Sequence, residues 1–288
     1  MPRFAPLSKM LPNRIMARAA LIMFLAMSLI PAGDSAGKIL STNGLSPVFV
    51  AWSRFVLGAL MVVPFYGRQA LPLMTDWRIW LRGALLACGI TCIQFALKYA
   101  PIGDVFAAFF IGPLVSYVLA GILLGEPMSR LRTLMILVGF CGVLLVVRPG
   151  TDMSIGLLYA VAAGTCYGSF LTASRWLSGI ASPGALVTTQ LVIASLLATP
   201  FALPQIPIMT PSIWSLTTIS AACSMLGNLI LLFAYRLAPA TKLAPFVYFQ
   251  LFAAILFGWL LFNDIPDALT WIGIAIILTS GVIAARAR

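Results

Sequence analysis

The sequence contains no histidine and only seven acidic residues among its 288. Without imidazole side chains, the chain cannot use a histidine general base, a histidine metal site or a histidine proton relay. Charged residues make up only 9% of the chain, whereas hydrophobic residues make up 61%, and the mean hydropathy is +1.05. In soluble domains about a quarter of the residues are charged. The composition therefore predicts an integral membrane protein.

Cysteine is also scarce, and the five cysteines all lie within apolar runs: Cys88, Cys92, Cys141, Cys166 and Cys223. Cys88 and Cys92 would share a helix face, but two ligands do not make a zinc site. Buried packing is favoured over metal binding or a disulfide. The stretch "GDSAGK" has one residue too few for a phosphate-binding loop. With no nucleophile–base pair and no carboxylate cluster, we expect no enzyme and no cofactor.

Ten apolar runs are long enough to span a membrane, which takes about 20 residues. The connections between them are short and carry Pro, Gly, Asn or Asp. The predicted fold is an all-α integral membrane protein with ten transmembrane helices. They are expected at 17–40, 47–66, 79–99, 103–124, 131–148, 155–177, 184–203, 212–235, 241–262 and 268–286.

The 18 Lys and Arg residues are distributed unevenly between the two ends of these helices. Most fall on one side, and only Lys38, Lys98 and Arg148 fall on the other, while Arg54 lies inside the second helix. Basic residues accumulate on the cytoplasmic side of membrane proteins. We therefore expect a multi-pass protein of a bacterial-type inner (plasma) membrane with both termini in the cytoplasm. The net charge of +11 then needs no nucleic-acid partner.

The chain repeats itself. "APIGDVFAAFFIGPLVSYVLAGILLGEP" from Ala100 corresponds to "APATKLAPFVYFQLFAAILFGWLLFNDIP" from Ala238, 138 residues later. "SPVFVAWSRFVLGALMVVPF" from Ser46 corresponds to "SPGALVTTQLVIASLLATPF" from Ser182. The spacing predicts two five-helix halves in one membrane domain, 1–150 and 151–288. Because five is odd, the second half must be inverted. Inverted repeats are typical of secondary transporters that work by alternating access.

The chain resembles the drug/metabolite transporter superfamily, of the EamA type with ten helices. The resemblance lies in "AWSRF" in the second helix, "ALKYAPIGDVFAAFFIGPLVSYVLAGILLGEP" across the third and fourth, and "ILVGFCGVLLVVRPG" in the fifth. It implies that helices 1, 3, 4, 6, 8 and 9 line a central cavity. Relatives export amino acids and other metabolites, and some take up S-adenosylmethionine, riboflavin or nucleotide sugars.

Besides Arg18 in its first turn, the first two expected helices contain three charged residues: Asp34, Lys38 and Arg54. Asp34 and Arg54 would both sit about 10 Å below the outer surface, at 1.5 Å of rise per residue. An isolated charge in a bilayer is costly, so we predict that Asp34 pairs with Arg54, with Lys38 joining them or extending outward. The cluster would hold helix 1 against helix 2, anchor a gate or bind a charged substrate group. Asp34 is expected to be the only deep carboxylate, and proton coupling through it is less favoured because nearby cations stabilise its ionised form.

Small residues and one proline mark places where helices approach or bend. Gly33 and Gly37 in helix 1, and Gly164 and Gly168 in helix 6, are four residues apart, a spacing that permits close helix packing. Simple packing explains them, and sliding during alternation is the alternative. Pro113, in the middle of helix 4, is expected to kink that helix.

A substrate site needs polar and aromatic side chains that avoid lipid. Gln94 and Asn228 carry amides inside expected helices and should face the bundle interior. Aromatic residues cluster on helices 4 and 9, although for any one of them core packing or lipid contact is favoured over substrate contact. The candidate substrate-binding residues are Thr91, Gln94, Tyr99, Phe110, Tyr167, Ser224, Asn228 and Tyr248.

The resemblance and the aromatic walls together predict a secondary transporter that exports amino acids, aromatic ones among them, by alternating access. The alternative is an uptake carrier for a larger metabolite such as S-adenosylmethionine or riboflavin. A channel would pass ions without saturable, stereoselective binding. The expected partners are a small-molecule substrate and membrane lipid. A monomer is the simplest expectation, and the sequence leaves the oligomeric state, the coupling and the direction of transport open.

Overall fold

The computed structural model describes residues 13–125, 130–148, 154–177, 179–237, 246–247 and 249–286, and the regular structure within them is helical. Two of the helices are short 3-10 turns, η1 (Leu71–Thr75) and η2 (Leu203–Gln205). The α-helices are α1 (Asn13–Thr42), α2 (Pro47–Ala70), α3 (Trp77–Tyr99), α4 (Ile102–Phe109), α5 (Ile111–Leu124), α6 (Arg130–Val147), α7 (Ile155–Trp176), α8 (Pro183–Ala202), α9 (Pro211–Leu237), α11 (Phe249–Phe262) and α12 (Ala268–Arg286).

Ten of these segments correspond to the ten expected spans. Seven are long and apolar enough to cross a membrane by themselves, and one of the seven, Ile102–Leu124, consists of α4 and α5 in succession. Three shorter apolar helices, Thr133–Val147, Phe249–Phe262 and Ala268–Ala284, belong to α6, α11 and α12. The protein is therefore an all-α membrane protein of ten helices, as predicted.

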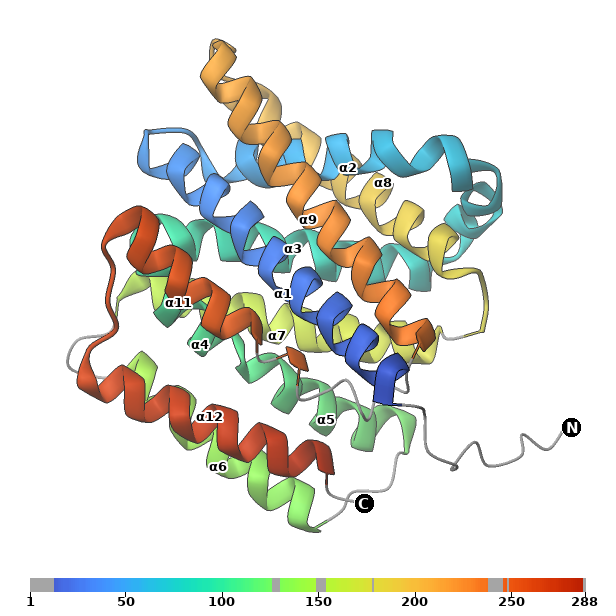
Figure 1. The fold of residues 1–288 in the computed structure, drawn as a ribbon. Helices are drawn as coiled ribbons and strands as arrows, with labels where there is room; N and C mark the ends of the chain where they lie inside the picture. Colours follow the sequence, from blue (N-terminus) through green and yellow to red (C-terminus); the bar gives the residue numbers. More distant parts are fainter. Residues whose placement is uncertain are drawn as a thin grey trace, which may run out of the picture.

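Helix packing follows the inverted repeat. In the repeat, α2 corresponds to α8 and α6 to α12, and each of these pairs packs together. Figure 1 shows α2 and α8 along one edge of the bundle and α6 and α12 along the opposite edge. Between the edges, α1 packs on α9 and α3 packs on α7. The repeat relates α1 to α7 and α3 to α9, so these two interfaces are equivalent. Such reciprocal contacts are what a pseudo-twofold axis between two inverted halves produces.

The two ends of the bundle are distinguished by the helix termini that they carry. Helix α1 begins and α12 ends at the same end, on the right of Figure 1, which we call the terminal end. Helix α1 finishes at the opposite end, with Lys38 four residues before its last residue, Thr42. We call this opposite end the Lys38 end. Both names describe positions in the bundle and not sides of the membrane.

Equivalent helix starts in the two halves use the same local chemistry. Ser46 precedes α2, and its hydroxyl accepts a hydrogen bond from the backbone N–H of Val48. Ser182 precedes α8 and accepts likewise from Ala185. In both cases proline follows at the first helical position, where a missing N–H costs nothing. The repeated "SP" dipeptide is thus a repeated helix start.

The fourth span is broken where the sequence predicts a kink. α4 ends at Phe109 and α5 begins at Ile111, with Phe110 between them. Pro113 has no N–H to donate to the carbonyl four residues earlier, that of Phe109, and its ring crowds that carbonyl. The released Phe109 carbonyl faces α7, where a Cβ added to Gly164 would lie 2.5 Å from its oxygen. The break therefore depends on proline in one helix and glycine in its neighbour.

Candidate functional site

Asp34 on α1 and Arg54 on α2 form a buried ion pair. The Arg54 Nη1 donates to Asp34 Oδ1 at 2.5 Å, and only 3% of Asp34 and 7% of Arg54 is exposed. Both helices are largely apolar, so each charge needs a partner before it can be buried. The pairing that the two depths predicted is present. Its role in gating or binding stays a prediction.

The second half of the chain completes the coordination of Arg54. Its Nη2 donates to the hydroxyl of Ser224 on α9 at 2.5 Å. One turn along α9, the Asn228 amide donates to the Ser224 carbonyl at 2.8 Å. Asn228 is exposed although it lies well inside an apolar helix. The guanidinium thus links α2 and α1 of the first half to α9 of the second.

Gln94 on α3 lies behind the same carboxylate. Its Nε2 is 3.4 Å from Asp34 Oδ1, a long hydrogen bond, and none of the residue is exposed. Its Oε1 is buried and has no hydrogen-bond partner among the described residues. A Cβ added to Gly37 would lie 2.5 Å from this oxygen, so glycine at 37 is what allows the amide to lie against α1.

The result is one connected polar cluster rather than separate binding and ion-pair sites. It contains one acid, one base, two amides and a hydroxyl: Asp34, Arg54, Gln94, Asn228 and Ser224. We call it the central cluster. Its acid and base balance, so it carries no net charge, and it extends from fully buried Gln94 to exposed Asn228. Such a set can offer donors and acceptors to a neutral or zwitterionic ligand.

Lys38 does not join this cluster. Its Nζ bonds Asp264 Oδ2 at 2.7 Å and the Ala100 carbonyl at 3.2 Å, and it lies 4.5 Å from the centre of the Phe262 ring. Asp264 lies in the connection between α11 and α12. The expectation that Lys38 would join Asp34 or extend outward is therefore wrong. Lys38 pairs with Asp264, an acid of the second half that is distant in the sequence, and not with Asp34 on its own helix.

A second carboxylate lies within a membrane helix, but at the very start of that helix, whereas Asp34 lies eight residues before the end of α1. Asp104, in the first turn of α4, has its Oδ1 buried without a hydrogen-bond partner among the described residues. Nearby, Arg148 at the end of α6 forms an ion pair with Asp267 just before α12. Hydrogen bonds from Arg148 hold the pKa of the Asp267 carboxyl well below its usual range. The Lys38 end thus carries Asp104 beside two acid–base pairs, Lys38–Asp264 and Arg148–Asp267.

The other described candidate residues are distributed over α3, α7 and the break between α4 and α5. Thr91 is partly exposed on α3, and Tyr99 lies exposed at the end of that helix, with Lys98 Nζ 5.5 Å from its ring centre. Phe110 lies partly buried in the break between α4 and α5. Tyr167 on α7 packs on Phe109, with ring centres 5.1 Å apart. Tyr248 lies outside the described residues.

A structural role for Arg82 was not expected from the sequence, because a cation near the start of a span usually lies at the membrane surface. In the structure Arg82 is only 6% exposed. Its Nε donates to Ser174 Oγ at 2.8 Å and its Nη1 to the Leu186 carbonyl at 3.0 Å, so it joins α3 to α7 and α8. The repeat could have indicated this role, because the residue equivalent to Arg82, 138 positions later, is Ser220 on α9. The Ser220 hydroxyl donates to the Gly33 carbonyl of α1 at 2.7 Å. Equivalent positions therefore bridge equivalent interfaces.

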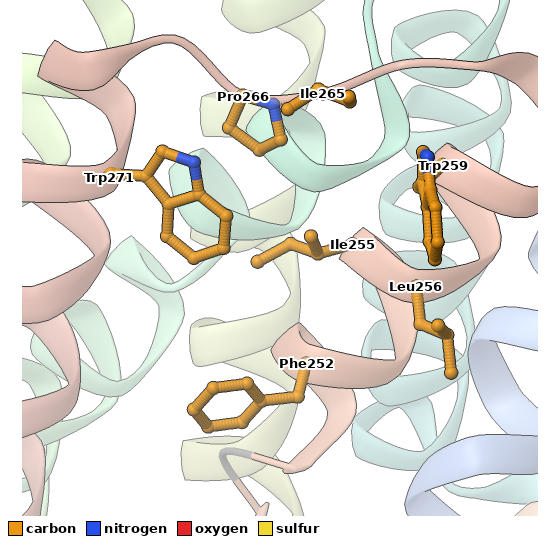
Figure 2. Close-up of a pocket in the computed structure, with 7 residues that line it drawn as sticks. All are labelled: Phe252, Ile255, Leu256, Trp259, Ile265, Pro266 and Trp271. Atoms are coloured by element: carbon orange, nitrogen blue, oxygen red, sulfur yellow. The ribbon is translucent and has the colours of Figure 1, made fainter.

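Two cavities lie away from the central cluster. One, of about 260 Å³, lies between α11, the following connection and α12, and Figure 2 shows its apolar lining. The other, of about 460 Å³, lies between α3, α5 and α7 and is lined mainly by leucines, with Ser169, Thr172 and Trp176. Neither is lined by a candidate substrate-binding residue. The residues that line the first cavity offer no side-chain polar group to orient a ligand, apart from the indole N–H groups of Trp259 and Trp271.

Both halves of the chain match one known protein family. Residues 17–148 and 154–286 each match the EamA-like transporter family. A riboflavin transporter of Vibrio cholerae is 30% identical over 82% of this chain and 82% of its own length. An S-adenosylmethionine uptake transporter of Rickettsia prowazekii is 28% identical over 85% of this chain and 84% of its own. A solved structure superposes with a TM-score of 0.63 at 19% identity, covering 93% of this chain and 96% of the other, which supports the fold alone.

Proposed function

Because the chain belongs to the EamA-like transporter family, we propose that it carries a ring-bearing, hydroxylated metabolite of the riboflavin or S-adenosylmethionine type by alternating access. The family makes the chain a multi-pass membrane transporter rather than an enzyme. The observation that carries the proposal about the site is the central cluster. It joins the two halves and extends to Asn228, an exposed amide inside an apolar helix.

The chemistry of the central cluster suits this substrate class. Hydroxyl groups need donors and acceptors without a fixed charge, and the partly exposed Ser224 and the exposed Asn228 supply them. A substrate that carries an amino group and a carboxylate can instead match Asp34 and Arg54. An amide side chain avoids lipid, so the exposed face of Asn228 is expected to contact water or substrate. The exposed residues beside it on α9, Leu226 and Leu229, are apolar, as is usual in small-molecule sites.

Export of amino acids, the first expectation from the sequence, receives no support from these two relatives. Their names describe riboflavin and S-adenosylmethionine transport. Amino-acid export therefore becomes the competing outcome of the substrate test.

The substrate test is counterflow in proteoliposomes, run in parallel with labelled riboflavin, S-adenosylmethionine and phenylalanine. Saturable counterflow of riboflavin or S-adenosylmethionine, unaffected by excess phenylalanine, is the expected result. Counterflow of phenylalanine alone would overturn the proposed class and favour amino-acid transport. Circular dichroism and size-exclusion profiles of the reconstituted sample establish that the protein is folded.

Replacing Asn228 with Ala should weaken substrate binding with little effect on folding, because the side chain is exposed and bonds only within its own helix. Loss of one hydrogen bond to a neutral group predicts a roughly three- to tenfold rise in the half-saturation concentration for counterflow. Thr279→Ala is the matched control, since Thr279 is also exposed and bonds its own helix in α12, far from the central cluster. Equal behaviour of the two variants would move the site away from Asn228.

We also propose that the terminal end faces the cytoplasm and the Lys38 end faces outward. The excess of basic residues at the terminal end supports this orientation. A green fluorescent protein fused to the C-terminus should fluoresce, and alkaline phosphatase fused there should be inactive. The opposite pattern would reverse the assignment of the two ends.

A further inference from the structure

We propose that Asp104 is a proton-binding residue that controls closure of the Lys38 end, by competing with Asp264 for Lys38. The proposal rests on the ion pairs and burial at this end and is independent of the substrate. It goes beyond the proposed function, which concerns the central cluster.

The contact that closes this end is the Lys38–Asp264 ion pair. Lys38 belongs to α1 in the first half, and Asp264 precedes α12 in the second half, so the 2.7 Å bond ties the halves together. The side chain of Lys38 is only 7% exposed and that of Asp264 28% exposed. Partial burial makes this pair stronger than a pair on an open surface, because water screens it less. Any opening between the halves at this end must break it.

Asp104 provides a second carboxylate for the same lysine. The Lys38 Nζ already reaches the Ala100 carbonyl, which lies four residues before Asp104 at the start of α4. Asp104 Oδ1 is buried and has no hydrogen-bond partner among the described residues. Unlike Asp264, Asp104 lies in the same half as Lys38. A Lys38–Asp104 pair would therefore hold no contact between the halves.

The surrounding charges make Asp104 suitable for taking up and releasing a proton. Burial acts most strongly on its carboxyl group, followed in decreasing order by the charges of Asp267, Arg148, Asp264 and Lys38. Lys98, on the neighbouring α3, lies over the Tyr99 ring. With Arg148 bonded to Asp267 and Lys38 bonded to Asp264, both nearby cations already have carboxylate partners. A third ionised carboxylate here is costly, and a proton removes that cost.

The competition gives a defined response to pH. With Asp104 protonated, Lys38 has one carboxylate partner, Asp264, and the Lys38 end stays closed. With Asp104 ionised, Lys38 can exchange Asp264 for Asp104, and the tie between the halves is released. Loss of the proton therefore favours opening. The equilibrium constant for opening, if it is linked to one proton, changes by up to about tenfold per pH unit across the titration range of that proton.

Hydrogen–deuterium exchange of the protein in nanodiscs tests this without any substrate. The quantity is the protection factor of peptides covering 38–46 and 258–267, corrected for intrinsic exchange, between pH 5.5 and 8. In the wild type, protection should fall as pH rises. Asp104→Asn, which imitates the protonated residue, should keep high protection at both pH values. Asp264→Asn should have low protection at both.

The matched control is Asp76→Asn, which removes an acid–base pair with Arg78 between α2 and α3, at the terminal end of the bundle. It should retain the pH dependence of the wild type. Wild-type protection that does not change with pH would overturn the proposal, as would an unchanged pH response in Asp104→Asn. If Asp104→Asn does not fold, Lys38→Gln decides the question, because without the lysine the pH response should vanish.

This outcome is separable from the substrate assignment. A failed counterflow panel leaves the exchange data standing, and a flat exchange profile leaves the substrate class untouched.

Discussion

Replacing Asp34 with Asn is expected to reduce the stability of the protein by about 3–5 kcal/mol, the usual result of breaking a buried ion pair from one side. The cost arises because Arg54, itself only 7% exposed, keeps its charge and loses the carboxylate bonded to it. Ser224 continues to accept one hydrogen bond from the guanidinium, but a hydroxyl does not neutralise it. Transport should be lost together with stability, because the same guanidinium joins the two halves.

A second substitution should restore part of this loss. In the double variant Asp34→Asn with Arg54→Met, no uncompensated charge remains, and an apolar chain of similar length fills the space. Replacing a buried ion pair by apolar residues is often neutral or even stabilising. We therefore expect the double variant to unfold at a higher denaturant concentration than Asp34→Asn, while remaining inactive. Unfolding in mixed micelles and counterflow in proteoliposomes measure the two properties separately.

Asp267→Asn is the matched control for this series. Its ion pair with Arg148 also connects two helices, but more than half of the Asp267 side chain is exposed. Asn at that position can still accept the hydrogen bond from the Thr270 N–H that starts α12. Exposed pairs contribute about 0–1 kcal/mol, so this variant should remain near the wild type. Wild-type stability in Asp34→Asn, or a double variant no better than the single one, would contradict the account of the ion pair.

The second large effect is expected for Gly168→Ala in α7. A Cβ at this position would overlap the Gly112 carbonyl oxygen of α5 and lie 2.9 Å from the Cβ of Val115. Both obstacles are backbone or atoms next to it, so rotation of a side chain cannot make room. The two helices must separate along their length, which also loosens the contact between Ser116 and Thr172, now 3.4 Å apart. Overpacking costs about 1–3 kcal/mol, and we expect the upper end or beyond because backbone must move.

Gly67→Ala in α2 is the control, because it makes the same chemical change in a helix with room for it. The nearest atom to its added Cβ is a terminal carbon of Val63 at 3.3 Å, which can shift. Alanine is a better helix former than glycine by about 1 kcal/mol, so this variant should be neutral or slightly more stable. Thermal unfolding in detergent compares the two. A stabilised Gly168→Ala would mean that α5 and α7 are not in backbone contact.

Much of the fold follows from local and periodic features of the sequence. Apolar runs of sufficient length predict the spans, because only a helix satisfies its own backbone in lipid. The break beside Pro113 follows from a missing N–H, and the "SP" starts of α2 and α8 follow from capping chemistry. The inverted pairing of α2 with α8 and α6 with α12 follows from the repeat together with an odd number of helices.

The site was only partly predictable. Asp34 and Arg54 lie on consecutive helices joined by a short turn, so depth alone brought them together. Gln94 and Asn228 stood out because amides avoid lipid, and both belong to the central cluster. The places of Tyr99, exposed at the end of α3, and of Tyr167, packed on Phe109, were harder to predict, because an aromatic ring in a membrane helix is equally suited to packing, lipid and substrate.

By itself the sequence determined the number of spans, the two related halves and the pairing of Asp34 with Arg54. Each depends on hydrophobic length, internal similarity or nearness along the chain. Only the tertiary structure decided that Lys38 pairs with Asp264, that Ser224 completes the coordination of Arg54, and that Arg82 and the Oδ1 atom of Asp104 are buried. These contacts join helices from opposite halves or depend on how neighbouring helices cover a side chain. The rotation of one helix against another fixes them, and no local pattern in the chain records that rotation.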